Sequence, residues 1–328
     1  MKQFSGKLLA GLIATCALAG APSQALAQSA AKYPTKPIHV IVNSPPGGGV
    51  DVVGRVVADR VMKSQKWTIV VENRAGAGGN IGSSYVAKSA ADGYTLLLTP
   101  NNQNMNAFIY KDPGYHPRKD FVAVVQLTEA PSVFITGPKS PFKSLKNVVD
   151  AARAAPGKVV FGTSGVGTPT HAAGELLKKA AKINMTAVAY KGGALANQDV
   201  MGGQIPLGVA ALPAVMGTIK AGKLRALAMT SEKRWPGLPD IPTAVESYPG
   251  VVHMTWIGAL APRGTPAPVI AQLNKEISAV LAIPEMRERI AGLGAQPVGK
   301  SSADFEAMLK ADYEESGKLA KEIGLKLQ

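Results

Sequence analysis

The clearest pattern in the chain is a short apolar run, followed by a glycine-rich segment and then by an amphipathic run. Residues 38–42 are mostly β-branched, which is typical of a buried strand. Valines recur at positions 50, 53, 57 and 61, and this three- and four-residue spacing predicts a helix with one apolar face. Two prolines and three consecutive glycines separate the two runs, at 45–49. The pattern predicts a strand, a tight turn and a helix.

Short apolar runs continue to alternate with helical patterns. Residues 67–72 and 94–98 are expected to be strands, with a helix at about 83–89 between them. The order β-α-β-α-β predicts a parallel sheet whose loops gather at the carboxyl ends of the strands. Three loops are therefore candidates for ligand binding, at 43–51, 73–82 and 99–104.

A second set of strands and helices follows. Pro138 and Pro141 mark a crossing into a second lobe, and recurring prolines between 232 and 249 mark a return. From residue 122 onwards, across both lobes, the sequence predicts strands at 122–127, 132–136, 159–161, 187–190, 205–210, 222–229 and 255–260. It predicts helices at 169–182, 266–282, 284–291 and 302–323, and a short helix after Gly193 that ends at Met201.

These elements predict an α/β protein with two lobes, each a mixed sheet flanked by helices. Residues 28–131 and 251–328 are expected to form lobe 1, and residues 132–250 lobe 2. Because the chain crosses between the lobes twice, we expect a hinge at the crossings.

The N-terminus has the features of a secretory signal peptide. Lys2 and Lys7 give a basic start, an apolar stretch follows, and a small-x-small site ends at Ala27. We therefore expect cleavage after Ala27 and export. No apolar run reaches the roughly 18 residues of a membrane span, so the exported chain is expected in the periplasm. Cys16, the only cysteine, raises a lipoprotein alternative, but Thr15 before it makes a poor lipidation signal.

Charge and composition narrow the partners. Cleavage lowers the net charge from +14 to +12, because the removed segment carries two lysines and no acidic residue. The basic excess is spread along the chain and aromatic residues make up only 5%, which argues against a nucleic-acid surface. A basic balance instead favours anionic solutes.

Two loops have the composition of an anion site. In the 45–51 loop, glycines allow backbone N–H groups to approach a ligand closely, and the following helix start favours negative charge. The alternative is a tight connection that binds nothing. Ser164 and Thr168 make a second such loop, with Thr168 as the predicted N-cap before Pro169. The amide-rich loop at 99–104 suits a polar solute or is a solvated turn.

Motifs of other functions fail at specific positions. Residues 217–224 nearly match a phosphate-binding loop, but Leu224 stands where Ser or Thr is required. The segment 162–166 departs from a nucleophile elbow at Val166. The four histidines lack zinc-like spacing. His171 is expected to bond at a helix terminus rather than to contact a ligand. We predict no catalytic residue, no metal and no cofactor.

The chain resembles a known family from Tyr33 to its end. The matching segments are Pro46-Gly47-Gly48 with Asp51, Glu72-Asn73-Arg74 with Gly76 to Gly79, Asp92 to Leu96, Ser164-Gly165 with Gly167, Thr168 and His171, Tyr190-Lys191-Gly192, Gly222 to Ala228, Leu238 to Thr243, and Ala261-Pro262 with Gly264 to Pro266. In this order they resemble the periplasmic substrate-binding proteins of tripartite tricarboxylate transporters, also called Bug proteins.

The resemblance implies a monomeric Venus-flytrap protein, similar to type II binding proteins, that closes on a small organic carboxylate. Its implied partners are integral-membrane permease subunits, with no nucleic acid and no cofactor. The implied ligand-binding residues are Pro46, Gly47, Gly48, Gly49, Asp51, Gly78, Gly79, Thr99, Ser164, Gly165, Thr168 and Tyr190. Asn43, Ser44 and Ala210, at positions where the chain departs from the family, are also predicted to bind the ligand. A sensor protein feeding a two-component system would have the same site and is the alternative.

Two departures from the family pattern bear on the ligand. Many relatives have Pro-Phe where this chain has Asn43-Ser44, and Phe-Asp where it has Val209-Ala210. Without that aspartate no carboxylate is expected to pair with a ligand amine, so we predict a ligand with no essential ammonium group. Asp51 is expected to organise its loop, because a carboxylate beside the ligand's own would repel it.

Overall fold

The computed structural model describes residues 33–325. The predicted signal peptide, with Cys16 and the cleavage site after Ala27, lies outside these residues. A short unit ends at Thr35, and the main unit begins at Lys36 and contains the strands and helices of the described residues. Within residues 33–325, no helix has both the length and the apolar character that a membrane span requires.

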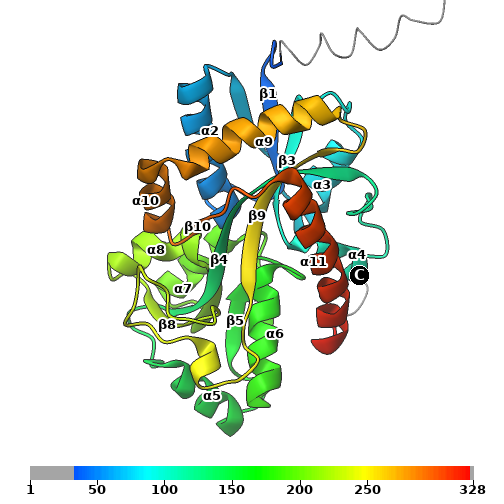
Figure 1. Ribbon diagram of the computed structural model, residues 1–328. Coiled ribbons are helices and arrows are strands. Elements are labelled where there is room, and N and C mark those ends of the chain that lie inside the picture. Colours follow the sequence, from blue (N-terminus) through cyan, green and yellow to red (C-terminus); the bar gives the residue numbers. More distant parts are fainter. Residues whose placement is uncertain (1–32, 326–328) are drawn as a thin grey trace, which may run out of the picture. The chain divides into compact units, whose positions relative to one another are not determined.

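The strands of the main unit form one continuous mixed sheet (Figure 1). They are β1 Ile38–Val42, β2 Ile69–Asn73, β3 Thr95–Pro100, β4 Phe121–Thr136, β5 Val160–Thr163, β6 Thr186–Ala189, β7 Leu207–Ala211, β8 Arg225–Met229, β9 Met254–Pro262 and β10 Gln296–Pro297. Their order is β2-β1-β3-β9-β4-β7-β5-β6, and β8 and β10 also pair with β4. One parallel group, β1 to β3, and another, β5 to β7, are thus separated by the antiparallel pair β9 and β4.

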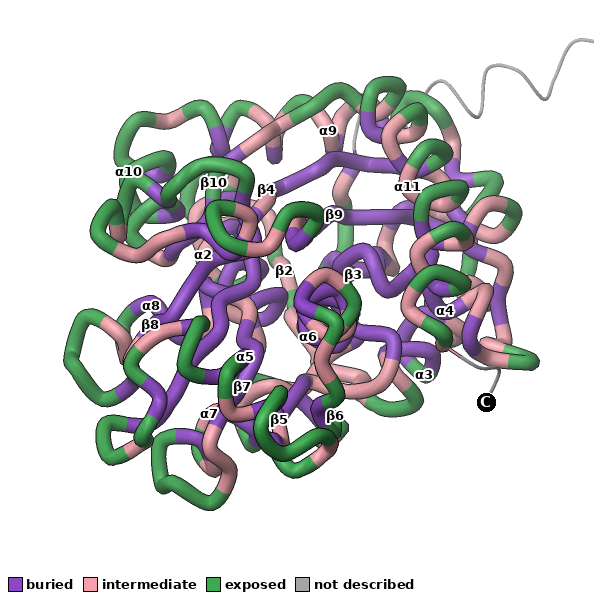
Figure 2. The backbone as a smooth tube through the Cα atoms, turned by 90° about the horizontal axis from the view of Figure 1, so that it is seen from below, coloured by how far each residue is buried: buried purple, intermediate pink, exposed green. Residues whose placement is uncertain are grey.

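Strand β4 belongs to both halves of the sheet. It pairs with β9 as far as Pro131 and with β7 from Ser132 onwards. The sequence predicted two strands here, which was wrong, because the structure has one strand of 16 residues. Pro131 has no N–H to donate, and it lies where the strand exchanges one partner for the other. Figure 2 shows β4 and β9 buried along nearly their whole length.

Helices cover the sheet. They are α2 Gly49–Gln65, η1 Ala77–Gly79, α3 Asn80–Ala87, α4 Asn102–Ile109, α5 Leu145–Ala154, α6 Pro169–Ala181, α7 Gly193–Gly202, α8 Leu212–Lys220, η2 Ala244–Glu246, α9 Ala267–Ala282, α10 Pro284–Gly292 and α11 Ser302–Glu322. The sequence predicted none of α4, α5 and α8. The fold is that of two lobes. Lobe 1 contains β1 to β3 with β9 and a core that includes Leu97, Trp256 and Phe305. Lobe 2 contains β5 to β8 and a core around Phe134, Phe161 and Leu177.

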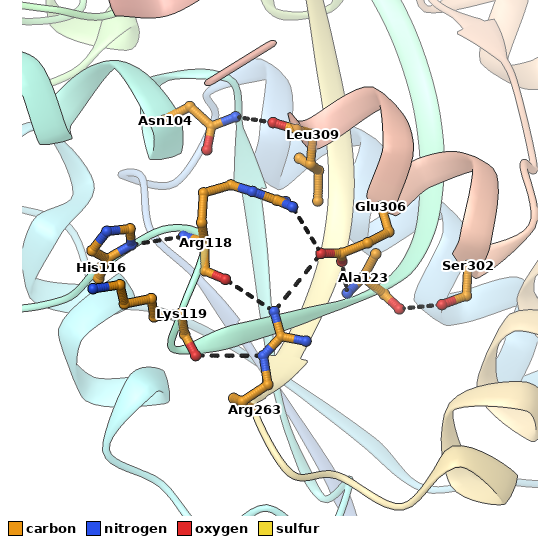
Figure 3. Close-up of polar contacts among 9 residues, drawn as sticks. All are labelled: Asn104, His116, Arg118, Lys119, Ala123, Arg263, Ser302, Glu306 and Leu309. Atoms are coloured by element: carbon orange, nitrogen blue, oxygen red, sulfur yellow. Dashed lines mark hydrogen bonds and ion pairs between the residues drawn. The ribbon is translucent and has the colours of Figure 1, made fainter. Parts of the chain in front are cut away.

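The C-terminal helix α11 returns to lobe 1, where its first turns are fixed by polar contacts (Figure 3). Glu306 Oε2 accepts a hydrogen bond from the Ala123 N–H at 3.1 Å, and Glu306 Oε1 lies 3.1 Å from Nη2 of Arg118. Ser302 Oγ donates to the Ala123 carbonyl at 2.6 Å. These contacts connect the end of the chain to β4. The boundaries predicted at 131 and 250 remain a prediction.

Candidate functional site

A cavity of about 650 Å³ lies between the lobes, at the carboxyl ends of the parallel strands. On lobe 1 it is lined by the loops after β1, β2 and β3, and on lobe 2 by the loops after β5, β6 and β7. Strands β4 and β9 contribute Ala130, Thr255 and Ile257. The cavity therefore borders the two strands that connect the lobes.

Ten of the residues predicted from the sequence line this cavity. They are Asn43, Ser44, Gly48, Gly49, Gly78, Gly79, Ser164, Gly165, Thr168 and Tyr190. Five predicted residues do not line the cavity. Pro46 and Gly47 are exposed, whereas Asp51, Thr99 and Ala210 are buried. Of these five, Gly47, Asp51 and Thr99 act on the cavity through hydrogen bonds to neighbouring residues.

Asp51 holds the 43–51 loop from inside. Asp51 is only 5% exposed. Its carboxylate accepts hydrogen bonds from the Gly47 N–H at 2.9 Å, from Arg55 Nε at 2.8 Å and from Asn73 Nδ2 at 2.9 Å. Asp51 lies in the first turn of α2, so it also interacts favourably with the helix dipole. With all these donors on one buried carboxylate, Asp51 organises the loop and does not face the cavity.

Thr99 holds the side-chain amide of Asn43 in place. Asn43 Nδ2 donates to Thr99 Oγ1 at 2.7 Å and to Ser83 Oγ at 3.2 Å, and Thr99 is fully buried. Gly79, with φ of +98°, packs against the same amide, because a Cβ there would lie 2.8 Å from Asn43 Nδ2. Thr99 thus acts on the cavity through Asn43, and Gly79 leaves no room for a side chain.

The amide-rich segment after β3 starts a helix, α4, which corrects the expected loop. Its amides are buried and bind protein groups. Asn102 and Asn106 both donate to the Gly78 carbonyl, the latter at 3.0 Å, and Asn104 donates to Asp312 Oδ2 at 2.7 Å. Only Asn102 of these lines the cavity. The amides hold the glycine turn 77–79 in place and connect α4 to α11.

On lobe 2, the loop before α6 is held by neutral groups. Thr168 occupies the predicted N-cap position, but its hydroxyl donates to the Gly165 carbonyl at 2.7 Å and makes no side-chain cap. Thr170 Oγ1 accepts from the Ser164 N–H at 3.0 Å. His171 Nδ1 accepts from the Gly167 N–H at 3.2 Å, the helix-terminus bond that the sequence favoured. Burial lowers the pKa of His171, so the ring is a neutral acceptor.

Tyr190 and Ala210, the two remaining predicted residues, have different environments. Tyr190 lines the cavity, and its hydroxyl donates to Asp199 Oδ2 at 2.6 Å. That hydrogen bond is the main reason that the pKa of Tyr190 is raised. Ala210 is 2% exposed and pairs with Val133, so its neighbour Ala211 reaches the cavity instead.

The two lobes touch beside the cavity. The Pro45 ring lies so close to Gly192 that a Cβ there would be 2.5 Å from Pro45 Cγ. On another side Ile109 packs against Gly167, where a Cβ would be 1.9 Å from Ile109 Cδ1. Both glycines have positive φ, at +124° and +71° respectively. Glycine at these positions permits the close approach of the lobes.

The sequence did not single out five polar residues that line the cavity, Tyr110, Thr170, Lys191, Asn197 and Thr255. Lys191 lies within a family-matching segment, whereas Tyr110 follows the helix α4 that was not predicted. Burial raises the pKa of Tyr110. No Asp or Glu lines the cavity, and the described residues contain no cluster of His, Cys, Asp or Glu that could hold a metal ion.

Comparison with known proteins agrees with this architecture. Residues 53–325 match the family model described as the tripartite tricarboxylate transporter family receptor. The chain is 37% identical to the protein BugT of Bordetella pertussis over 305 residues, covering 92% of this chain and 93% of that protein. It is 36% identical over 321 residues to a protein encoded in the tcbD-tcbE intergenic region of a Pseudomonas species, covering 97% and 94%.

Solved structures show the same fold. An R. palustris protein with adipate matches with a TM-score of 0.88 at 33% identity, covering 90% of this chain and 100% of that one. The periplasmic binding protein BugD matches with a TM-score of 0.85 at 33% identity, with coverage of 90% and 100%. MatC from Rhodopseudomonas palustris, with bound malate, matches with a TM-score of 0.82 at 28% identity, with coverage of 88% and 99%. The chain therefore belongs to the receptor family of tripartite tricarboxylate transporters, a family of periplasmic solute-binding proteins.

Proposed function

We propose that this protein captures a small carboxylate in the periplasm and delivers it to a membrane permease. The observation that carries the proposal is the pair of loops that face each other across the cavity. Each loop precedes a helix, α2 on lobe 1 and α6 on lobe 2, and each places small residues and the start of that helix at the cavity wall. Helix N-termini of this kind favour a carboxylate.

Hydrogen bonds to a charged group supply the binding energy in this proposal. A bond between a backbone N–H and a carboxylate is worth about 1.5–3 kcal/mol. Two lobes that each donate to one ligand then favour the closed form, because the ligand makes both sets of contacts only when the lobes are together. The predicted lobes, 28–131 with 251–328 and 132–250, move about β4 and β9. The adipate and malate complexes of similar proteins support the chemical class of the ligand.

The lining also bears on what else the ligand carries. Since no carboxylate lines the cavity, an ammonium group on the ligand would find no charged partner there. We therefore propose a carboxylate without an essential ammonium group. A tight complex with aspartate or glutamate, measured by calorimetry on ligand-stripped protein, would contradict this. The proposal includes no catalysis, a signal peptide cleaved after Ala27, and a monomer.

The test begins with the exported protein, purified from the periplasm. Native mass spectrometry identifies a carried ligand, and a thermal-shift screen of mono-, di- and tricarboxylates follows on stripped protein. We expect at least one carboxylate to raise the melting temperature, by an amount that grows with the logarithm of its concentration once this exceeds the dissociation constant. A screen in which no carboxylate shifts the melting temperature would overturn the proposed function.

A further inference from the structure

Most polar side chains of the cavity wall already have protein partners. Ser164 and Thr170 bond to each other, Thr168 bonds to Gly165, and Tyr190 bonds to Asp199. Four wall residues have a side-chain oxygen with no hydrogen-bond partner, but protein atoms cover these oxygens. The four residues are Asn43, Ser44, Asn102 and Thr255. These groups shape the wall, and few of them remain to select a ligand.

Two side chains on opposite lobes are exceptions. Tyr110 of lobe 1 is half-buried, lines the cavity, and its hydroxyl has no hydrogen bond to any described residue. Lys191 of lobe 2 is exposed, lines the cavity, and makes no ion pair or hydrogen bond within residues 33–325. Lys191 is also the one charged side chain among the described wall residues. Asn197 is free as well, but a neutral amide does not discriminate between charges.

The sheet order places these two groups on the side of the cavity away from the hinge. Strands β2 and β6 are the two ends of the order, so the loops that follow them are farthest from β4 and β9. Lys191 is the second residue after the end of β6. Tyr110 packs on the loop after β2, because a Cβ on Gly78 would lie 2.8 Å from its hydroxyl oxygen. A ligand that fills the cavity therefore meets both donors at its end away from the hinge.

We propose that Tyr110 and Lys191 are specificity-determining residues that hold a second anionic group of the ligand at this end. The inference rests on the proposed function, in which backbone N–H groups hold the first carboxylate. A tyrosine hydroxyl can donate one hydrogen bond and an ammonium up to three, and neither competes with a protein acceptor here. The ligand is then a dianion, with one carboxylate at the helix starts and the other between Tyr110 and Lys191.

The test compares acids that differ by one carboxylate. Calorimetry on stripped protein uses butyrate with succinate, hexanoate with adipate, and benzoate with terephthalate. The variants are Lys191→Met and Tyr110→Phe. Their matched controls are Lys223→Met, an exposed lysine of lobe 2 away from the cavity, and Tyr85→Phe, whose exposed ring stacks on Arg74 in lobe 1. Chemical unfolding confirms that each variant is folded.

We expect the wild type to prefer the diacid in at least one pair. Lys191→Met should weaken that diacid about fivefold, because an exposed charge pair contributes little, and should leave the matched monoacid nearly unchanged. The loss should shrink as salt is added. Tyr110→Phe should also weaken the diacid about fivefold, and both controls should behave as wild type.

Other outcomes overturn the inference. A wild type that binds monoacids as tightly as diacids, or variants that lose both members of a pair equally, would exclude this role for Tyr110 and Lys191 while leaving carboxylate binding intact. If the wild type bound none of the six acids, that result would instead contradict the proposed function itself.

Discussion

The loop at 43–51 in lobe 1 and the loop at 163–171 in lobe 2 have the same place in the fold but are braced by different chemistry. Each follows a parallel strand, contains small residues and leads into a helix. The first is fixed by the buried carboxylate of Asp51, which accepts three hydrogen bonds. The second is fixed by the hydroxyls of Thr168 and Thr170 and by the neutral ring of His171.

The difference shows how an anion site can include a carboxylate. In lobe 1 the negative charge is turned away from the cavity and satisfied by protein donors, so it does not face a ligand carboxylate. In lobe 2 the groups that hold the loop by hydrogen bonds are uncharged. A consequence is that the brace of lobe 2 includes an imidazole, a group that can take up a proton in mild acid.

The largest effect is expected from Asp51→Ala. The variant removes the buried carboxylate that accepts from the Gly47 N–H, from Arg55 and from Asn73, and a hydrogen bond to a charged group is worth about 1.5–3 kcal/mol. We expect the free energy of unfolding in urea to fall by about 3 kcal/mol. Ligand affinity should fall as well, because the loop loses its shape.

Asp51→Asn is the matched control, because it keeps one acceptor oxygen but removes the charge. It should retain part of the stability and part of the binding. If Asp51→Asn abolished binding while the melting temperature stayed at the wild-type value, Asp51 would contact the ligand and the contrast between the two loops would be wrong.

Thr170→Val breaks the neutral brace and should have the next largest effect. The side-chain shape is retained, but the Ser164 N–H loses the acceptor that it contacts at 3.0 Å. The expected loss is about 1–2 kcal/mol in urea unfolding, smaller than for Asp51→Ala because no charge is involved. A loss equal to that of Asp51→Ala would remove the distinction between a charged and a neutral brace.

The sequence predicted much of this arrangement. The apolar and glycine patterns predicted both βα loops, and Asp51 was expected to organise its loop because like charges repel. The division of β4 into two strands was wrong because local pattern cannot show that Pro131 lies where the strand changes partners. Helix α4 was missed because Asn is typical of turns, and only the buried contacts with Gly78 and Asp312 explain the place of Asn104 and Asn106 in a helix.

The cavity residues that were missed depend on distant contacts. Tyr110 reaches the wall because α4 positions it against Gly78, a residue far away in sequence. Lys191 reaches it because β6 is at the end of the sheet order, which depends on long-range pairing. Thr99 and Ala210 were predicted to bind the ligand, but neither lines the cavity. A strand pattern shows which residues lie on the same face, but not how far a face lies from the cavity.

Acidification should loosen the brace of lobe 2. Burial lowers the pKa of His171 below its usual 6.5 in the folded protein, so the unfolded chain takes up the proton more readily. The stability from the neutral ring is complete above about pH 6.5 and is lost as the pH falls towards the folded pKa. Protonation also ends the bond from the Gly167 N–H, because Nδ1 can no longer accept.

The measurement is urea unfolding of wild type and of His171→Asn between pH 7.5 and 4.5. Asn keeps an acceptor near the Nδ1 position but does not titrate. Over this pH range we therefore expect the variant to lose about 1 kcal/mol less of its free energy of unfolding than the wild type loses. Burial lowers the pKa of His253 to about 4, which acts in the same direction, and raises that of Asp312 to about 6, which acts in the opposite one. Both groups remain in the variant, so their contributions cancel. Identical pH profiles would contradict the role of His171.

The smallest effect is expected from Arg55→Met, which removes the exposed partner of Asp51. Arg55 is half-exposed and donates to Asp51 Oδ1 and to Asn73 Oδ1, at 2.8 and 2.7 Å. Solvent screens its charge, so the free energy of unfolding should fall by only about 0.5 kcal/mol, and less in high salt. The Gly47 and Asn73 donors remain on the carboxylate in the variant. A loss as large as that of Asp51→Ala, persisting at high salt, would show that the ion pair holds the lobe 1 loop instead of the buried hydrogen bonds.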